Sequence, residues 1–179
     1  INYYLRNGDP NYYPEFTQEN FTHIINMSND EISPDRIPGE STIYDHFPIN
    51  EQEKDDDKQR TVLLNAAKRI HDIINESPTN KIYVHCSLGV NRSPAAVIMY
   101  YIKYCNMTLY EAYCKIAKIR RIFTSVDLFD VLYQEACLLD GPERTISPLK
   151  IRTHYEYGFY YKNAYLYALY DMMHLDEMW

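Results

Sequence analysis

The sequence KIYVHCSLGVNRSPAAVIMYYIKY spans residues 81–104 and sets the expected architecture of the chain. Residues 81–84 are rich in β-branched and aromatic side chains and predict a short buried strand. Residues 85–92 contain a glycine and predict a loop. Ser93 suits a helix N-cap and Pro94 the first helical position, and the apolar run after them predicts a central helix packed on several sides. A strand, a loop and a helix in this order indicate an α/β architecture.

The apolar pattern on both sides of this stretch predicts further strands and helices. Strands are expected at residues 3–5, 22–27 and 42–49, and helices at residues 61–76, 109–119 and 126–139. We therefore expect one α/β domain over residues 1–140. Residues 141–179 are rich in tyrosine and are expected to form a C-terminal helical extension, which either packs on the domain or provides an interface such as that of a homodimer.

The composition indicates a soluble protein with one core. The chain has 179 residues, of which 46% are hydrophobic and 24% charged. It contains no apolar run long enough for a membrane span and no secretory leader, so a cytoplasmic or nuclear location is expected. The net charge of -7 argues against nucleic-acid or anionic-lipid partners.

The cysteines lack the spacing of a zinc site, and the chain is too large to need disulfide staples. Free thiols and no bound metal are therefore expected. Three of these residues fall on apolar helical faces and are expected to pack in the core: Cys105, Cys114 and Cys137.

The loop at residues 85–92 carries residue types suited to holding a phosphoryl group. A loop that enters a helix turns backbone N–H groups inward and forms a concavity for a tetrahedral dianion. Cys86 at its base is expected to be a thiolate nucleophile, and Arg92 can offer two parallel donors to phosphate oxygens. Gly89 lets the backbone close round the anion, and the Ser93 hydroxyl can reach the sulfur. The residues expected to bind the phosphate are Ser87, Leu88, Gly89, Val90, Asn91 and Arg92.

An isolated cysteine at the end of a strand is more often an inert core thiol. Arginine is rarely placed in an apolar core, however, so the occurrence of Arg92 in the same loop favours a functional role for Cys86. His85 beside it is expected to support the loop backbone rather than to move protons.

The motif His-Cys-x5-Arg-Ser at residues 85–93 resembles the phosphate-binding loop of the cysteine-dependent protein phosphatases, and most closely that of the dual-specificity group. Residues 21–28, 47–49 and 108–112 extend the resemblance over residues 1–139. It implies an α/β fold with a central, mostly parallel sheet of about five strands flanked by helices. It also implies hydrolysis of phosphotyrosine, phosphoserine and phosphothreonine in a phosphoprotein partner, through a phosphocysteine on Cys86 and without a metal or other cofactor.

The resemblance implies a general acid, an Asp that follows a hydrophobic-Pro-hydrophobic strand. Counting from residues 47–49 reaches Glu51, whereas counting back from the nucleophile by the usual separation reaches Asp55, with Asp56 adjacent. We rank Asp55 first, Glu51 second and Asp56 third. The alternative is that most of the acidic run at 51–57 is a solvated face.

The sequence is also compatible with two other functions. The RNA 5′-triphosphatases of the same superfamily often have an Asn before the Arg, as Asn91 is here, although the net charge opposes that activity. The departure at the acid position also allows a phosphoprotein-binding module without catalysis. A second departure is Ser125-Val126, where the family often has Pro-Asn, and it leaves open how the phosphate loop is supported from that side.

Overall fold

The computed structural model of the chain describes residues 3–7, 20–32, 37, 41–52, 55–120, 122 and 124–140. Four strands in this part of the chain form one parallel sheet in the order β1-β4-β2-β3. Their bounds are β1 (Tyr3–Asn7), β2 (His23–Asn26), β3 (Ile43–His46) and β4 (Ile82–Cys86). The predicted α/β class with a parallel sheet is confirmed, and the described residues contain four strands where about five were expected.

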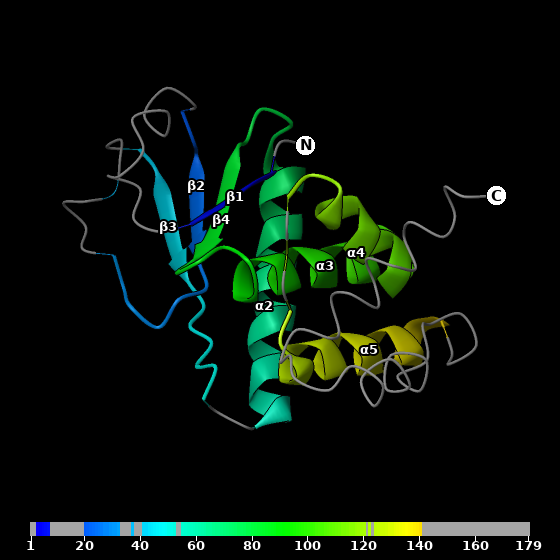
Figure 1. Cartoon of the computed structure of the whole chain (residues 1–179). Helices are drawn as coiled ribbons and strands as arrows, with labels where there is room; N and C mark the ends of the chain where they lie inside the picture. The colour runs from blue at the N-terminus through cyan, green and yellow to red at the C-terminus, as the bar shows by residue number, and fades with distance from the viewer. Residues whose placement is uncertain are drawn as a thin grey trace.

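Four helices in the described residues lie beside this sheet. Their bounds are α2 (Asp56–Glu76), α3 (Arg92–Tyr104), α4 (Leu109–Ala117) and α5 (Val126–Asp140). Figure 1 shows them gathered together to the right of the sheet. Within the described residues, no helix combines the length and the apolar character needed to cross a membrane. The helix predicted within residues 141–179 lies outside the described residues.

The central strand β4 is buried on both faces, as expected for a strand inside a parallel sheet. Ile82 and Val84 belong to the main core, which also contains residues of all four helices. Tyr83 points to the other face and packs with Phe21 and Ile24. Because successive side chains of a strand alternate between faces, β4 joins both cores and places Cys86 at the helix-covered side.

Helix α2 begins at Asp56, so the predicted start at residue 61 is wrong. Asp55 is its N-cap and accepts a hydrogen bond from Lys58 N at 3.1 Å. Asp56 and Asp57 then place negative charge in the first turn, where the helix dipole favours it. The charged residues of this turn carry no apolar periodicity, which is why the pattern of apolar residues missed them.

Helix α3 begins at Arg92 with Asn91 as its N-cap, so the predicted cap at Ser93 is also wrong. Pro94 therefore occupies the third helical position, where a missing N–H still costs no helical hydrogen bond. The predicted cap of α4 is confirmed, because Thr108 and Glu111 form a reciprocal capping box. The cysteines predicted as core residues are only half-buried; these are Cys105, Cys114 and Cys137.

A buried carboxylate joins three helices of the main core. Glu135 of α5 is 4% exposed and accepts hydrogen bonds from Arg60 of α2 and Lys103 of α3. The distances are 2.8 Å from Arg60 Nε and 2.6 Å from Lys103 Nζ. The charge of Glu135 is therefore compensated inside the fold, and the two cations hold α2 and α3 against α5.

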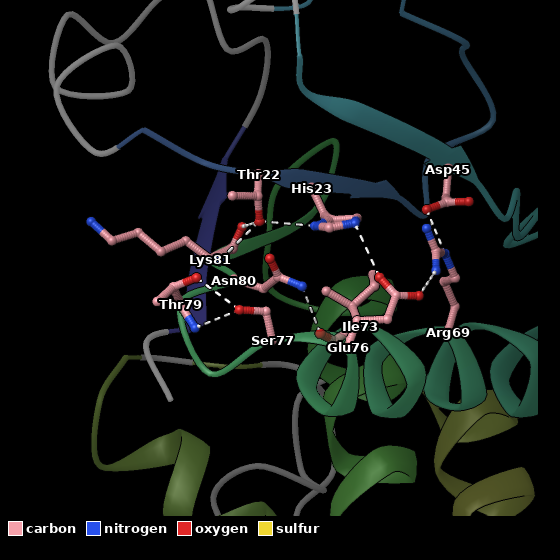
Figure 2. A network of polar contacts seen from close by, with 10 residues as sticks. All are labelled: Thr22, His23, Asp45, Arg69, Ile73, Glu76, Ser77, Thr79, Asn80 and Lys81. Carbon is pink, nitrogen blue, oxygen red and sulfur yellow. Dashed lines mark hydrogen bonds and ion pairs between the residues drawn. The ribbon is translucent and has the colours of Figure 1, made fainter.

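A polar network joins the last turns of α2 to β2 and β3 (Figure 2). Arg69 Nε donates to Asp45 Oδ2 at 2.8 Å, and Arg69 Nη1 lies 3.3 Å from Glu76 Oε1. The buried ring of His23 has Nδ1 at 2.8 Å from Thr22 Oγ1 and Nε2 at 3.9 Å from Glu76 Oε2. The network fixes α2 against the two strands at the end of the helix remote from its N-cap.

We expect Glu135→Ala to lower the free energy of unfolding by about 2 kcal/mol, because it leaves two partly buried cations without their carboxylate. The matched control is Asp72→Ala, which breaks the exposed pair with Lys68 and is expected to change stability by less than about 0.5 kcal/mol. Urea unfolding of both variants provides the measurement. Equal losses in the two variants would show that Glu135 does not clamp the helices.

The stability is expected to fall as the pH drops below about 6.5, the ordinary pKa of histidine. Burial lowers the pKa of His85 to about 4, and burial together with Arg69 lowers the pKa of His23. The unfolded chain therefore binds these protons first, and His85 alone removes about 3 kcal/mol once the pH reaches its folded-state pKa. Above about pH 7 both rings are neutral in both states and contribute no pH dependence.

Urea unfolding between about pH 7 and pH 5 tests this dependence. His85→Gln should lose less stability over that range than the parent chain. His71→Gln is the control, because the His71 ring lies at the surface of α2 and stacks on Tyr104. A pH dependence unchanged by His85→Gln would contradict the assignment of a buried neutral imidazole.

Candidate active site

The Cys86 sulfur lies at the carboxyl end of β4 and receives two hydrogen bonds. The residue is 2% exposed, and its Sγ lies 3.3 Å from Gly89 N and 3.3 Å from Ser93 Oγ, both of which donate to it. Donors of this type stabilise a negatively charged sulfur. In place of the helix cap predicted for Ser93, its hydroxyl contacts the Cys86 sulfur, as the sequence had also suggested.

The loop between β4 and α3 folds back over the sulfur. Gly89 has a φ of 67°, in the left-handed region that a residue with a Cβ adopts only at a cost. The Gly89 N–H faces Cys86 Sγ, and the positive φ lets the chain continue from that point toward α3. Ser87 and Leu88 are exposed, whereas Val90 and Asn91 are half-buried. The exposed part of the loop is where an incoming phosphate would meet the backbone N–H groups and the N-terminus of α3.

The Arg92 guanidinium is buried against this loop, with 8% of its side chain exposed. Its Nη2 donates to Ser87 Oγ at 2.9 Å and its Nη1 to the Ile49 carbonyl oxygen at 3.3 Å. Its Nε lies 3.2 Å from Glu51 Oε1. Each of the three nitrogens therefore has a neighbour within the protein, and the guanidinium, which has five N–H groups, keeps others for a phosphate.

The structure separates the three acidic candidates. The Glu51 side chain is 47% exposed and reaches the phosphate loop, where its Oε1 also accepts a hydrogen bond from Asn91 Nδ2 at 2.8 Å. Asp55 caps α2 and Asp56 lies exposed in the first turn of that helix. Only Glu51 of these three has a described contact with the loop that holds Cys86.

The side chain of Asn91 links three segments, which the sequence did not predict. While Nδ2 binds Glu51, Oδ1 accepts a hydrogen bond from Ser125 N at 2.8 Å, just before α5. The departure at Ser125-Val126 left open how the segment before α5 supports the loop at residues 85–92. In the structure Asn91 of that loop makes the contact with Ser125. The sequence feature that could have drawn attention to Asn91 is its position directly before Arg92, because asparagine is a residue type favoured at helix N-caps.

His85 lies beneath the loop with a ring that is 3% exposed. The ring stacks on Tyr83 with 5.1 Å between centroids, and burial lowers its pKa to about 4. A neutral, packed imidazole suits the predicted supporting role better than proton transfer. In the described part of the chain, no group of three or more potential metal-ligand side chains comes together.

Residues 4–134 match the family model described as dual specificity phosphatase, catalytic domain. Human DUSP28 aligns with a TM-score of 0.60 and 14% identity over 73% of this chain and 84% of that chain. Tk-PTP in its active form aligns with a TM-score of 0.60 and 18% identity over 75% of this chain and 89% of that chain. A leucine rich repeat and phosphatase domain containing protein from Entamoeba histolytica aligns with a TM-score of 0.56 and 17% identity over 70% and 79% of the two chains. As the loop motif predicted, the chain belongs to the dual specificity phosphatase family.

Proposed function

We propose that this chain hydrolyses phosphotyrosine, phosphoserine and phosphothreonine in phosphoproteins, through a phosphocysteine on Cys86. The observation that carries the proposal is the sulfur at the base of the loop, with donors from Gly89 N and Ser93 Oγ. The contact of Arg92 with Ser87, the residue after the nucleophile, places a fixed cation beside the same loop. The family match supports this substrate class.

In the first step the Cys86 thiolate attacks phosphorus, so that a P–S bond forms and the ester P–O bond breaks. The leaving oxygen keeps the electron pair of the broken bond and takes a proton from Glu51, which enters this step as the protonated carboxylic acid and leaves it as a carboxylate. Arg92 exchanges its contact with Glu51 for two phosphoryl oxygens, a bidentate geometry that stabilises the charge of the transition state. The products of this step are the free alcohol or phenol and the phosphocysteine.

In the second step a water molecule attacks the phosphocysteine and the P–S bond breaks. Glu51, now a carboxylate, takes the proton of the water, and the sulfur regains the electron pair as a thiolate. The Ser93 hydroxyl, which lies 3.3 Å from Cys86 Sγ, stabilises the sulfur as it leaves. Inorganic phosphate is released and the enzyme returns to its starting form.

Glu51 is the acid favoured by this geometry, in place of Asp55, which the sequence ranked first. Its carboxylate already touches two residues of the loop, Asn91 and Arg92. Asp55 is occupied as the N-cap of α2, and moving its carboxylate to the substrate would uncap the helix. The proposal therefore assigns proton transfer to Glu51 and a structural role to Asp55.

We expect Cys86→Ser to lower turnover of phosphotyrosine and phosphoserine peptides by at least about a thousandfold, because the hydroxyl is a far weaker nucleophile. Cys137→Ser, a change of the same kind at a half-buried thiol of α5, should retain turnover. Release of phosphate from each peptide and from triphosphate-ended RNA gives the measurement. Preferred hydrolysis of the RNA would favour a triphosphatase, and binding of phosphopeptides without turnover by the parent chain would favour a binding module.

Glu51→Gln is expected to lower turnover of an ester with a poor leaving group by about a hundredfold, because the amide cannot donate the proton. Asp55→Asn is a sharp comparison, since asparagine caps a helix as well as aspartate and so leaves α2 intact. Its turnover should remain close to that of the parent. The pH profiles of kcat provide the measurement, and a larger loss in Asp55→Asn would transfer the role of acid to Asp55.

A further inference from the structure

Asn91 occupies the N-cap of α3, yet its side chain does not cap the helix. Asparagine is among the best N-cap residues because its side-chain oxygen accepts a hydrogen bond from a backbone N–H of the first turn. Here that oxygen accepts from Ser125 N at 2.8 Å instead. The Asn91 side chain therefore does not stabilise the first turn of α3 and instead contacts a segment 34 residues away in sequence.

The two contacts fix the orientation of the Asn91 amide. Nδ2 must face Glu51 Oε1 because the carboxylate needs a donor, and Oδ1 must face Ser125 N because a backbone N–H needs an acceptor. Reversing the amide would place oxygen against oxygen and N–H against N–H. The side chain is thus a fixed link between the loop of Glu51 and the start of α5.

Glu51 has a second partner, the Arg92 guanidinium, for which a substrate phosphoryl group competes. Its Oε1 lies 3.2 Å from Arg92 Nε in the free site, and a bound phosphoryl group competes for the same guanidinium. Once Arg92 turns to the phosphate, the hydrogen bond from Asn91 is the described contact that remains to hold the Glu51 carboxyl over the loop. Without that hydrogen bond the Glu51 side chain, which is half exposed, would be free to turn outward.

We propose that Asn91 is a positioning residue, which keeps the Glu51 carboxyl beside the leaving group while the substrate phosphate occupies Arg92. This inference rests on the function proposed above and adds a residue to it. Asn91 acts through Glu51, and its own side chain needs no contact with the transferred phosphoryl group. The segment before α5 contributes to this positioning, because Ser125 N donates to Asn91 Oδ1 and so holds the amide in its orientation.

Asn91→Asp tests the link directly. The new carboxylate can still accept from Ser125 N, whereas toward Glu51 it has no N–H to donate. We expect kcat/KM for phenyl phosphate, a poor leaving group, to fall about tenfold more than kcat/KM for an activated aryl phosphate that needs little protonation. Asn91→Ser, which lacks both contacts at this reach, should show the same preferential loss.

Asn75→Asp is the matched control, since it adds the same charge at an exposed asparagine of α2. Its two kcat/KM values should change in parallel. Equal losses on both esters in Asn91→Asp, together with weaker inhibition by inorganic phosphate, would overturn the inference and leave Asn91 only a shaping role in the loop. Thermal unfolding midpoints identify any variant whose losses come from unfolding.

The double variant Glu51→Gln/Asn91→Asp separates this inference from the function on which it rests. If Asn91 acts through Glu51, the double variant loses no more activity on phenyl phosphate than Glu51→Gln alone. Additive losses would overturn the positioning role. A Glu51→Gln variant whose losses are equal on the two esters would instead refute Glu51 as the acid, and that result is distinct from any outcome in Asn91→Asp.

Discussion

The structure depends on the short connection between the buried strand β4 and helix α3. Five residues separate Cys86 from Arg92, and within them the chain must leave the sheet, reverse and enter a helix. The left-handed conformation of Gly89 makes that reversal possible while its N–H faces the sulfur. Because both flanking elements are held in the main core, the loop cannot relax away from this geometry.

The segment after β3 and the start of α5 converge on this connection. Ile49 and Glu51 come from the segment after β3, and both contact Arg92. Ser125 precedes α5 and contacts Asn91. The parallel sheet explains the convergence of the first two, because strands that run in the same direction deliver the chain to the same edge. The topology of the sheet therefore brings the segment after β3 to the loop that holds Cys86.

The local features of this fold could be predicted from sequence, and the long-range ones could not. The strand predicted at residues 81–84, the loop after it and the Thr108 cap follow from residue types at short spacing, although β4 runs on to Cys86 and the predicted start of the loop at residue 85 is wrong. The start of α2 was missed because capping and charge, without apolar periodicity, extend the helix to Asp56. The contact between Glu51 and Asn91 spans 40 residues, so no local pattern could have ranked Glu51 above Asp55.

The charge balance of the site favours the exchange of one contact in the proposed mechanism. The chain carries a net charge of -7, so an anionic substrate gains little from the protein as a whole and must be held by the loop. Arg92 supplies the local positive charge, and in the free site Glu51 offsets part of it. In the proposed mechanism a phosphate dianion brings more charge and two oxygens in the geometry that a guanidinium prefers, so it competes with a single half-exposed carboxylate for Arg92. In the proposed mechanism the Glu51 carboxyl group then lies beside the bond to be broken only if another donor holds it there, and the amide of Asn91 is in contact with it.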